Sequence, residues 1–246
     1  MNPVVFIIML IVTMIPCQER VKVINAGIGG NTSGDLLGRV NEDVVSQNPD
    51  LVILMVGTND MVNSGKMVSY DTFNNNLLDI VNILKDAEIN IVLLSPLPVD
   101  TVYLFQRHQR SSYVELPNNK LANIRDIIRQ ISEDNNLYFV DIFAEFVKRG
   151  LPEHNTDDII RNVNNCGLND GVHPTEKGYE LIAQLVFDYL LGNKLIQQGM
   201  KVIFFGDSIT QGVHVEGEGT AQGHTYPARV SNLINSYFVN NLKSYD

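Results

Sequence analysis

The chain has 246 residues, of which 44% are hydrophobic and 19% are charged, enough for one globular domain with a substantial core. Its formal net charge of −10 argues against nucleic acid and anionic lipid surfaces as partners. The chain has two cysteines, Cys17 and Cys166, which excludes a disulfide framework and a cysteine-based zinc cluster.

The first segment, residues 4–15, is almost wholly apolar. It is too short to span a bilayer, which takes about 20 residues, so no stable membrane span is expected. A secretory leader over residues 1–19 is the favoured interpretation, and it predicts export to the periplasm or the extracellular space. Because no Lys or Arg precedes the apolar run and no small-residue cleavage site follows it, the alternative is an extra apolar element packed on the body.

From residue 20 onward, apolar runs typical of buried strands alternate with patterns typical of amphipathic helices. Strands are predicted at 21–25, 51–56, 90–95, 137–142 and 201–205, labelled A to E in that order. Helices are predicted at 35–47, 73–87, 120–133, 174–191 and 226–240. The alternation predicts an α/β fold with a five-stranded parallel sheet covered on both faces. Two long connections, 96–119 and 143–169, are expected to form substrate walls.

Side chains suited to ester hydrolysis stand at the ends of these elements. Ser208 follows strand E within Gly206-Asp207-Ser208, where open α/β sheets place their chemistry. Asp170 and His173 share one loop, and their spacing lets a single turn present a base together with the acid that orients it. Each also has a simpler explanation: Ser208 as a helix cap, Asp170 as a solvated loop acid and His173 as a helix-start residue.

Gly30 and Asn59 follow strands A and B and are suited to stabilising an oxyanion. Glycine lets a backbone N–H approach a substrate oxygen closely, and the Asn59 amide donates a hydrogen bond without charge. The N–H of Ser208 is the third candidate donor. Gly30 and Asn59 are each explained singly as turn residues, but their coincidence with the other candidates favours a catalytic site.

These residues resemble the four sequence blocks of the SGNH, or GDSL, hydrolase family, and the resemblance covers nearly all of residues 20–240. The blocks are Gly206-Asp207-Ser208-Ile209, Gly30, Gly57-x-Asn59-Asp60 and Asp170-x-x-His173. Membership would imply a flavodoxin-like three-layer fold and hydrolysis of acyl esters without a metal or another cofactor. It would also imply Ser208 as nucleophile, His173 as base and Asp170 as its orienting acid, with Ser208, Gly30 and Asn59 forming the oxyanion hole.

The order of the blocks departs from the family pattern. The Gly-Asp-Ser block comes first in the family and last in this chain, while the other blocks keep their order. This resembles a circular permutation in which the usual first strand and helix have moved to residues 200–240, joined through the polar link 192–199. Residues 20–246 are accordingly expected to form a single permuted domain.

The spatial order of the strands follows from the three oxyanion donors. Gly30, Asn59 and Ser208 follow strands A, B and E, and their donors must lie about 3 Å from one oxygen atom. Because neighbouring strands are about 4.8 Å apart, these three strands must be adjacent. Placing E between A and B brings Ser208 closest to both others and predicts the order A-E-B-C-D.

The favoured function is hydrolysis of carboxylic esters, with acetyl esters of carbohydrates as the favoured substrates within the class of small-molecule and carbohydrate esters. A lysophospholipase or general acyl esterase is the first alternative, and a non-catalytic domain that binds glycans or a partner is the second. The segment Gly27-x-Gly29-x-x-Thr32 matches a dinucleotide fingerprint only in part, because Thr32 replaces the third glycine. His214 and His224 are interpreted as solvated loop residues rather than substrate contacts.

Overall fold

The structure, a computed structural model, describes residues 19–242. Five strands form one parallel sheet: β1 (Lys22–Gly27), β2 (Leu51–Met55), β3 (Asn90–Leu94), β4 (Tyr138–Val140) and β5 (Lys201–Gly206). Their order in space is β1-β5-β2-β3-β4, which confirms the predicted order A-E-B-C-D. The last strand in the sequence therefore pairs with β1 on one side and with β2 on the other.

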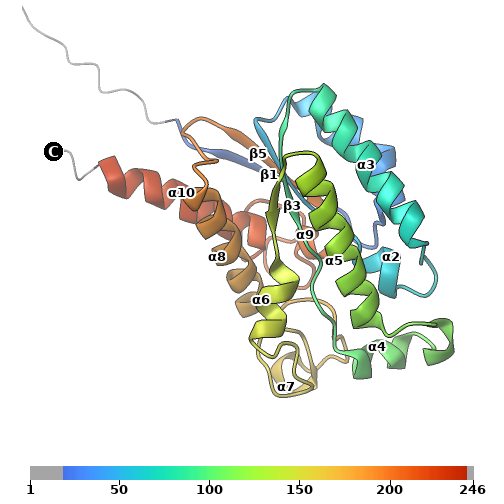
Figure 1. Cartoon of the computed structure of the whole chain (residues 1–246). Coiled ribbons are helices and arrows are strands. Elements are labelled where there is room, and N and C mark those ends of the chain that lie inside the picture. Colours follow the sequence, from blue (N-terminus) through green and yellow to red (C-terminus); the bar gives the residue numbers. More distant parts are fainter. Residues whose placement is uncertain (1–18, 243–246) are drawn as a thin grey trace, which may run out of the picture.

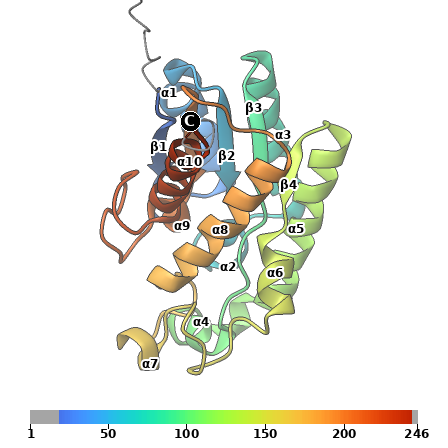
Figure 2. The ribbon, with the colours of Figure 1, turned by 90° about the vertical axis from the view of Figure 1, so that its left-hand side faces the viewer.

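Helices cover both faces of the sheet, and this three-layer arrangement is the predicted fold class (Figures 1 and 2). One core is shared with α1 (Ser33–Asp43), α3 (Tyr70–Asp86) and α5 (Pro117–Asp134), and the other with α6 (Ile142–Lys148), α8 (Glu176–Gly192) and α10 (Tyr226–Leu242). The remaining helices are short: α2 (Thr58–Val62), α4 (Thr101–Arg107), α7 (Val163–Cys166), α9 (Ser208–Gln211) and the 3₁₀ turns η1 (Val45–Gln47) and η2 (Arg110–Ser112).

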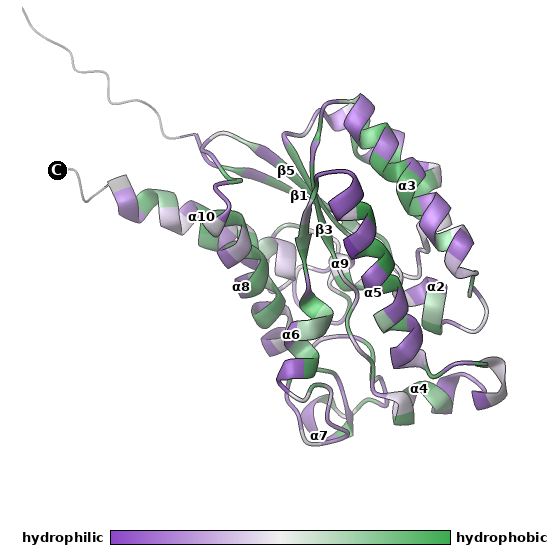
Figure 3. Ribbon diagram, viewed as in Figure 1, coloured by the Kyte–Doolittle hydropathy of each residue, from purple (hydrophilic) through white to green (hydrophobic). Residues whose placement is uncertain are grey.

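Strand β5 is apolar because both of its faces are covered. Val202 and Phe204 pack into the core beneath α8 and α10, and Ile203 and Phe205 pack into the opposite core. Phe204 meets Tyr226 of α10 edge to face, with ring centroids 5.4 Å apart. The same distribution is visible in Figure 3, where hydrophobic residues occupy the strands and the inner sides of the helices. A continuous apolar run is what a strand buried on both faces requires.

Capping residues move two element boundaries away from their predicted places. The strand predicted at 137–142 ends at Val140, because the Asp141 side chain accepts a hydrogen bond from the Ala144 N–H and begins α6. The helix predicted at 174–191 begins at Glu176, after the N-cap residue Thr175. The short helices were not predicted, because one or two turns show no periodic apolar face.

The predicted leader, residues 1–19, lies outside the described residues except for Glu19. Within residues 19–242, no helix is both long enough and apolar enough to cross a membrane. The predicted link, residues 192–199, runs from the end of α8 towards β5. Its Gly199 N–H donates a hydrogen bond to the Glu19 carbonyl (3.1 Å), so the link ends beside the start of β1.

We predict that the fold tolerates a reordered chain in which residues 200–242 precede residue 20 and the link 192–199 is opened. Asn235 of α10 exchanges hydrogen bonds with Val21 (3.0 and 3.3 Å), so α10 contacts the β1 segment directly. The helix continues about 10 Å beyond Asn235. A Gly/Ser linker of about ten residues, with a reach of about 17 Å, can therefore rejoin the ends.

Circular dichroism of this reordered chain should show a cooperative thermal transition within about 10 °C of that of the original chain, because only loop-closure entropy changes. The original chain carrying the same linker as an extension of its C-terminus is the matched control. Loss of the cooperative transition in the reordered chain alone would show that the link itself is needed for folding.

Candidate active site

Strand β5 delivers Ser208 to the carboxyl edge of the sheet. The strand ends at Gly206, where a Cβ atom would lie 2.2 Å from Thr210 Oγ1 and 2.4 Å from the Met55 carbonyl oxygen, so only glycine fits. Asp207 then caps α9 by accepting a hydrogen bond from the Ile209 N–H (2.9 Å). Ser208 becomes the first residue of α9, with 9% of its surface exposed.

Ser208, His173 and Asp170 form a continuous chain of hydrogen bonds. Ser208 Oγ lies 3.0 Å from His173 Nε2, and His173 Nδ1 lies 2.8 Å from Asp170 Oδ2. The other Asp170 oxygen accepts hydrogen bonds from the N–H groups of Val172 and His173, each at 2.8 Å. The structure thus brings together the three residues that the sequence singled out as nucleophile, base and orienting acid.

Asp170 determines the tautomer of His173. Burial by itself would raise the pKa of the Asp170 carboxyl, but hydrogen bonds and charge attraction from His173, together with the backbone N–H groups, outweigh it and hold the pKa below its usual range. The ionised carboxylate can only accept, so His173 Nδ1 carries the ring proton. In the neutral imidazole, Nε2 then carries no proton and can accept the Ser208 hydroxyl hydrogen, as a general base requires.

Helix α4 fixes the loop that carries Asp170. Gly171 has φ +72°, and a Cβ atom there would lie 2.8 Å from the Asp100 carbonyl oxygen. Its own carbonyl accepts a hydrogen bond from the Asp100 N–H (2.8 Å), and Arg107 donates to the Asp170 carbonyl (2.5 Å). The two ends of α4 therefore hold two successive residues of the loop.

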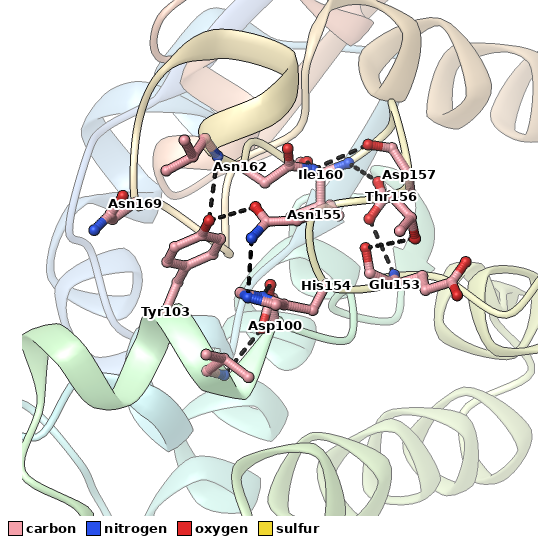
Figure 4. A network of polar contacts seen from close by, with 12 residues as sticks. Asp100, Tyr103, Glu153, His154, Asn155, Thr156, Asp157, Ile160, Asn162 and Asn169 are labelled. Carbon is pink, nitrogen blue, oxygen red and sulfur yellow. Dashed lines mark hydrogen bonds and ion pairs between the residues drawn. The ribbon is translucent and has the colours of Figure 1, made fainter.

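A second Asp–His pair anchors the neighbouring loop to the start of α4 (Figure 4). His154 Nδ1 lies 2.7 Å from Asp100 Oδ2, and the His154 ring lies 4.7 Å from the Tyr103 ring, centroid to centroid. The Tyr103 hydroxyl donates to Asn155 and accepts from the Val163 N–H. The connection 143–169 therefore contacts the start of α4. It was expected to form a substrate wall, but it contributes no residue to the cavity beside Ser208.

Gly30 and Asn59 line the same cavity as Ser208 and His173. Gly30 has φ +76°, and its carbonyl accepts a hydrogen bond from Lys66 Nζ (2.7 Å). Asn59 lies on α2, and its Nδ2 donates to the Asn31 carbonyl (3.0 Å). Since an amide has two N–H bonds, the second remains for a substrate oxygen.

A buried carboxylate joins the turns that carry Gly30 and Asn59. Asp60 accepts hydrogen bonds from the Ser33 N–H (3.0 and 3.1 Å) and the Ser33 hydroxyl (2.5 Å). Burial raises the Asp60 pKa, although the bonds from Ser33 oppose the shift. Asp60 thereby ties the first turn of α1 to α2, and both candidate oxyanion donors become part of one rigid unit.

The cavity has a volume of about 310 Å³. Its lining includes three basic side chains that the sequence did not single out as site residues: Arg107, His108 and His214. His214 differs most from its interpretation as a solvated loop residue. Although 48% of its side chain is exposed, its Nε2 lies 3.9 Å from Asp170 Oδ2. His224, on the same loop, instead pairs with Glu176 of α8 (2.9 Å).

The buried Asp207, which directly precedes Ser208, should make the stability of the folded state depend on pH. It is fully buried, and its Oδ2 has no hydrogen-bond partner within residues 19–242. Burial raises its pKa from 3.8 to about 7. Between about pH 4 and pH 7 the unfolded chain has released a proton that the folded chain retains, so folded-state stability should fall as the pH rises through this window.

We expect Asp207→Asn to remove this part of the pH dependence. The stability of Asp207→Asn relative to the original chain should increase by a few kcal/mol between about pH 4 and pH 8. Urea unfolding of both proteins at each pH measures the difference, and Asp126→Asn, at an exposed site, is the matched control. Parallel pH profiles for the original chain and Asp207→Asn would show that Asp207 is ionised in the fold throughout.

Comparison with known proteins places this geometry in a family. The profile of the GDSL-like Lipase/Acylhydrolase family matches residues 13–181. An acetylxylan esterase of Geobacillus stearothermophilus is 27% identical over 172 residues, covering 67% of this chain and 69% of that protein. The uncharacterized lipoprotein YqeF of Bacillus subtilis is 26% identical over 202 residues, covering 76% and 80%.

Among solved structures, a catalytic mutant of Axe2, an acetylxylan esterase from Geobacillus stearothermophilus, matches with a TM-score of 0.53 and 26% identity, covering 67% of this chain and 69% of that one. The family match includes Gly30, Asn59, Asp170 and His173 and ends before Ser208. It spans more than half of the sequence, and the fold agrees with it. The chain therefore belongs to the GDSL-like lipase/acylhydrolase family and is a hydrolase of ester bonds.

Proposed function

We propose that the protein is a serine esterase that removes acetyl groups from carbohydrates, with Ser208, His173 and Asp170 as its catalytic residues. The observation that carries this proposal is the hydrogen-bonded chain from Ser208 through His173 to the ionised Asp170 at the edge of a cavity. One ring nitrogen of His173 faces the Asp170 carboxylate and the other faces the Ser208 hydroxyl, which is the arrangement that acyl transfer through such a triad requires.

In the proposed reaction, Ser208 Oγ attacks the ester carbonyl carbon while His173 Nε2 takes the hydroxyl proton. The bond from the carbonyl carbon to the alcohol oxygen then breaks, and His173 returns the proton to that oxygen. A water molecule attacks the acetyl-serine with His173 again as base, which releases acetate and restores Ser208. Asp170 stays ionised throughout and stabilises the imidazolium formed in each half-reaction.

The negative charge that develops on the carbonyl oxygen is assigned to three donors: the N–H groups of Ser208 and Gly30 and the side chain of Asn59. Support comes from their shared cavity and from the rigid unit that Asp60 builds between the two turns. Donors that are fixed before reaction lower the barrier, because no reorganisation is needed as the charge forms.

The acetyl-carbohydrate assignment is supported by the acetylxylan esterase relatives and by the small cavity, whose lining includes polar side chains such as Asn59, Asn63 and Arg107. A lysophospholipase or general acyl esterase would need room for a long acyl chain beside Ser208. A non-catalytic domain would bind a glycan or a partner without turning it over. Acetate release from acetylated xylan, compared with fatty-acid release from lysophosphatidylcholine, separates the three.

We also propose that residues 20–246 form one circularly permuted domain behind an export leader at residues 1–19. The permutation is supported by the family match, which ends at residue 181, and by β5, which is last in the sequence and central in the sheet. Export is supported by the relative that is named a lipoprotein. The reordered chain described above tests the permutation, and cell fractionation of the full chain tests export.

Ser208→Ala should reduce kcat for p-nitrophenyl acetate and for acetylated xylan about 10⁶-fold, while the circular dichroism spectrum stays unchanged. His173→Ala should cost a similar factor, because it removes the base. Asp170→Asn should cost less, about 10⁴-fold, because Asp170 orients the base and transfers no proton. A Ser208→Ala protein that keeps near-original kcat would refute the assignment of the nucleophile.

Asn59→Ala should lower kcat for p-nitrophenyl acetate by about 10²–10³ with a much smaller effect on KM, because the donor acts mainly in the transition state. Asn63→Ala, on the next turn and also lining the cavity, is the matched control and should change kcat far less. An Asn59→Ala effect confined to KM would show that this side chain binds substrate without stabilising the oxyanion.

A further inference from the structure

His214 is held against the catalytic pair by the loop after α9. Its backbone is left-handed, with φ +70°. The His214 N–H donates to Glu218 Oε2 (3.1 Å), and its carbonyl accepts a hydrogen bond from Arg161 Nη2 (2.6 Å). These two contacts aim the imidazole at the site, where it stands edge to face with His173, with ring centroids 5.6 Å apart.

The two imidazoles and Asp170 meet the donor requirements of a metal ion. One nitrogen of each ring and one Asp170 oxygen all lie within 4.8 Å of one another. Asp170 Oδ2 lies 2.8 Å from His173 Nδ1 and 3.9 Å from His214 Nε2. Tetrahedral Zn²⁺, with bonds of about 2.0–2.2 Å, places its ligands about 3.3 Å apart. Shifts of about 1.5 Å or less, mostly in the half-exposed His214, would satisfy this geometry.

We propose that Asp170, His173 and His214 form a site for a divalent cation of the Zn²⁺ type, and that an ion bound there switches the esterase off. Nitrogen and carboxylate ligands with one position open to water suit Zn²⁺. Asp170 contributes a permanent negative charge. The Arg107 guanidinium weakens the attraction, but it lies 4.0 Å from Oδ1, on the oxygen that is not offered to the ion.

The inhibition follows from the single proton of a neutral imidazole. In the resting site, Nδ1 of His173 carries that proton and Nε2 accepts the Ser208 hydroxyl. An ion bound to Nδ1 takes its lone pair, so the ring proton must reside on Nε2 and no proton is lost. Nε2 then donates to Ser208 Oγ and cannot accept its proton. The proposed ion is thus an inhibitor, distinct from the metal-free hydrolysis under Proposed function.

The test is calorimetric titration of zinc chloride into the full chain carrying Ser208→Ala, which keeps all three proposed ligands. We expect one ion bound per chain. Adding His214→Gln should weaken the affinity at least about tenfold, since loss of even an outer-shell partner costs about 10–100-fold. Adding His224→Gln, on the same loop and of similar exposure, should leave the affinity unchanged.

In the Ser208 protein, zinc should suppress p-nitrophenyl acetate turnover and a chelator should restore it, and His214→Gln should need at least about tenfold more zinc for the same fractional loss. ¹⁵N NMR of labelled histidine should show the His173 proton move from Nδ1 to Nε2. No zinc binding, or binding equally weakened by His214→Gln and His224→Gln, would overturn the proposal. The inhibition rests on the proposed function, whereas the binding arm decides the site even if no ester is hydrolysed.

Discussion

The assembly of the candidate active site depends on the position of β5, which lies between β1 and β2 in the sheet. The two pairings align Gly206 with Gly27 on one side and with Met55 on the other, so the three strands end at the same level. Ser208 and the turns that follow β1 and β2 are thereby brought to one cavity. Since β5 is the last strand made, the site cannot assemble until nearly the whole chain is available, and its formation requires contacts of long sequence separation.

The second constraint is the number of donors around each buried carboxylate. Asp170 receives two backbone N–H groups and the His173 ring, which is enough to keep it ionised despite its burial. Asp207 receives one backbone N–H and retains its proton to a higher pH. The same chemical group therefore has a lowered pKa at one position and a raised pKa at the other, because hydrogen bonds and not burial alone set its charge.

The proposed metal site uses the same negative charge on Asp170 that orients His173 in the proposed mechanism. A carboxylate that holds an imidazole in one tautomer presents an oxygen and a nitrogen side by side, and His214 adds a third donor within reach. Competence as a proton acceptor and sensitivity to a divalent ion then arise from the same pair of groups. The loop after α9 brings the third donor within reach, since Arg161 and Glu218 bond to the His214 backbone and so position its ring.

Features with a local signal could be predicted from the amino-acid sequence: apolar strands, amphipathic helices, Ser208 directly after a strand, and an acid three residues before a histidine. The strand order was also predicted correctly, from the expectation that three candidate oxyanion donors converge on one atom and therefore follow adjacent strands. The position of Arg107 and His214 beside Asp170 could be seen only in the tertiary structure. The same is true of the connection 143–169, which does not line the cavity. These contacts join residues far apart in sequence through irregular loops, whose paths are set by capping and buried hydrogen bonds that leave no periodic pattern in the chain.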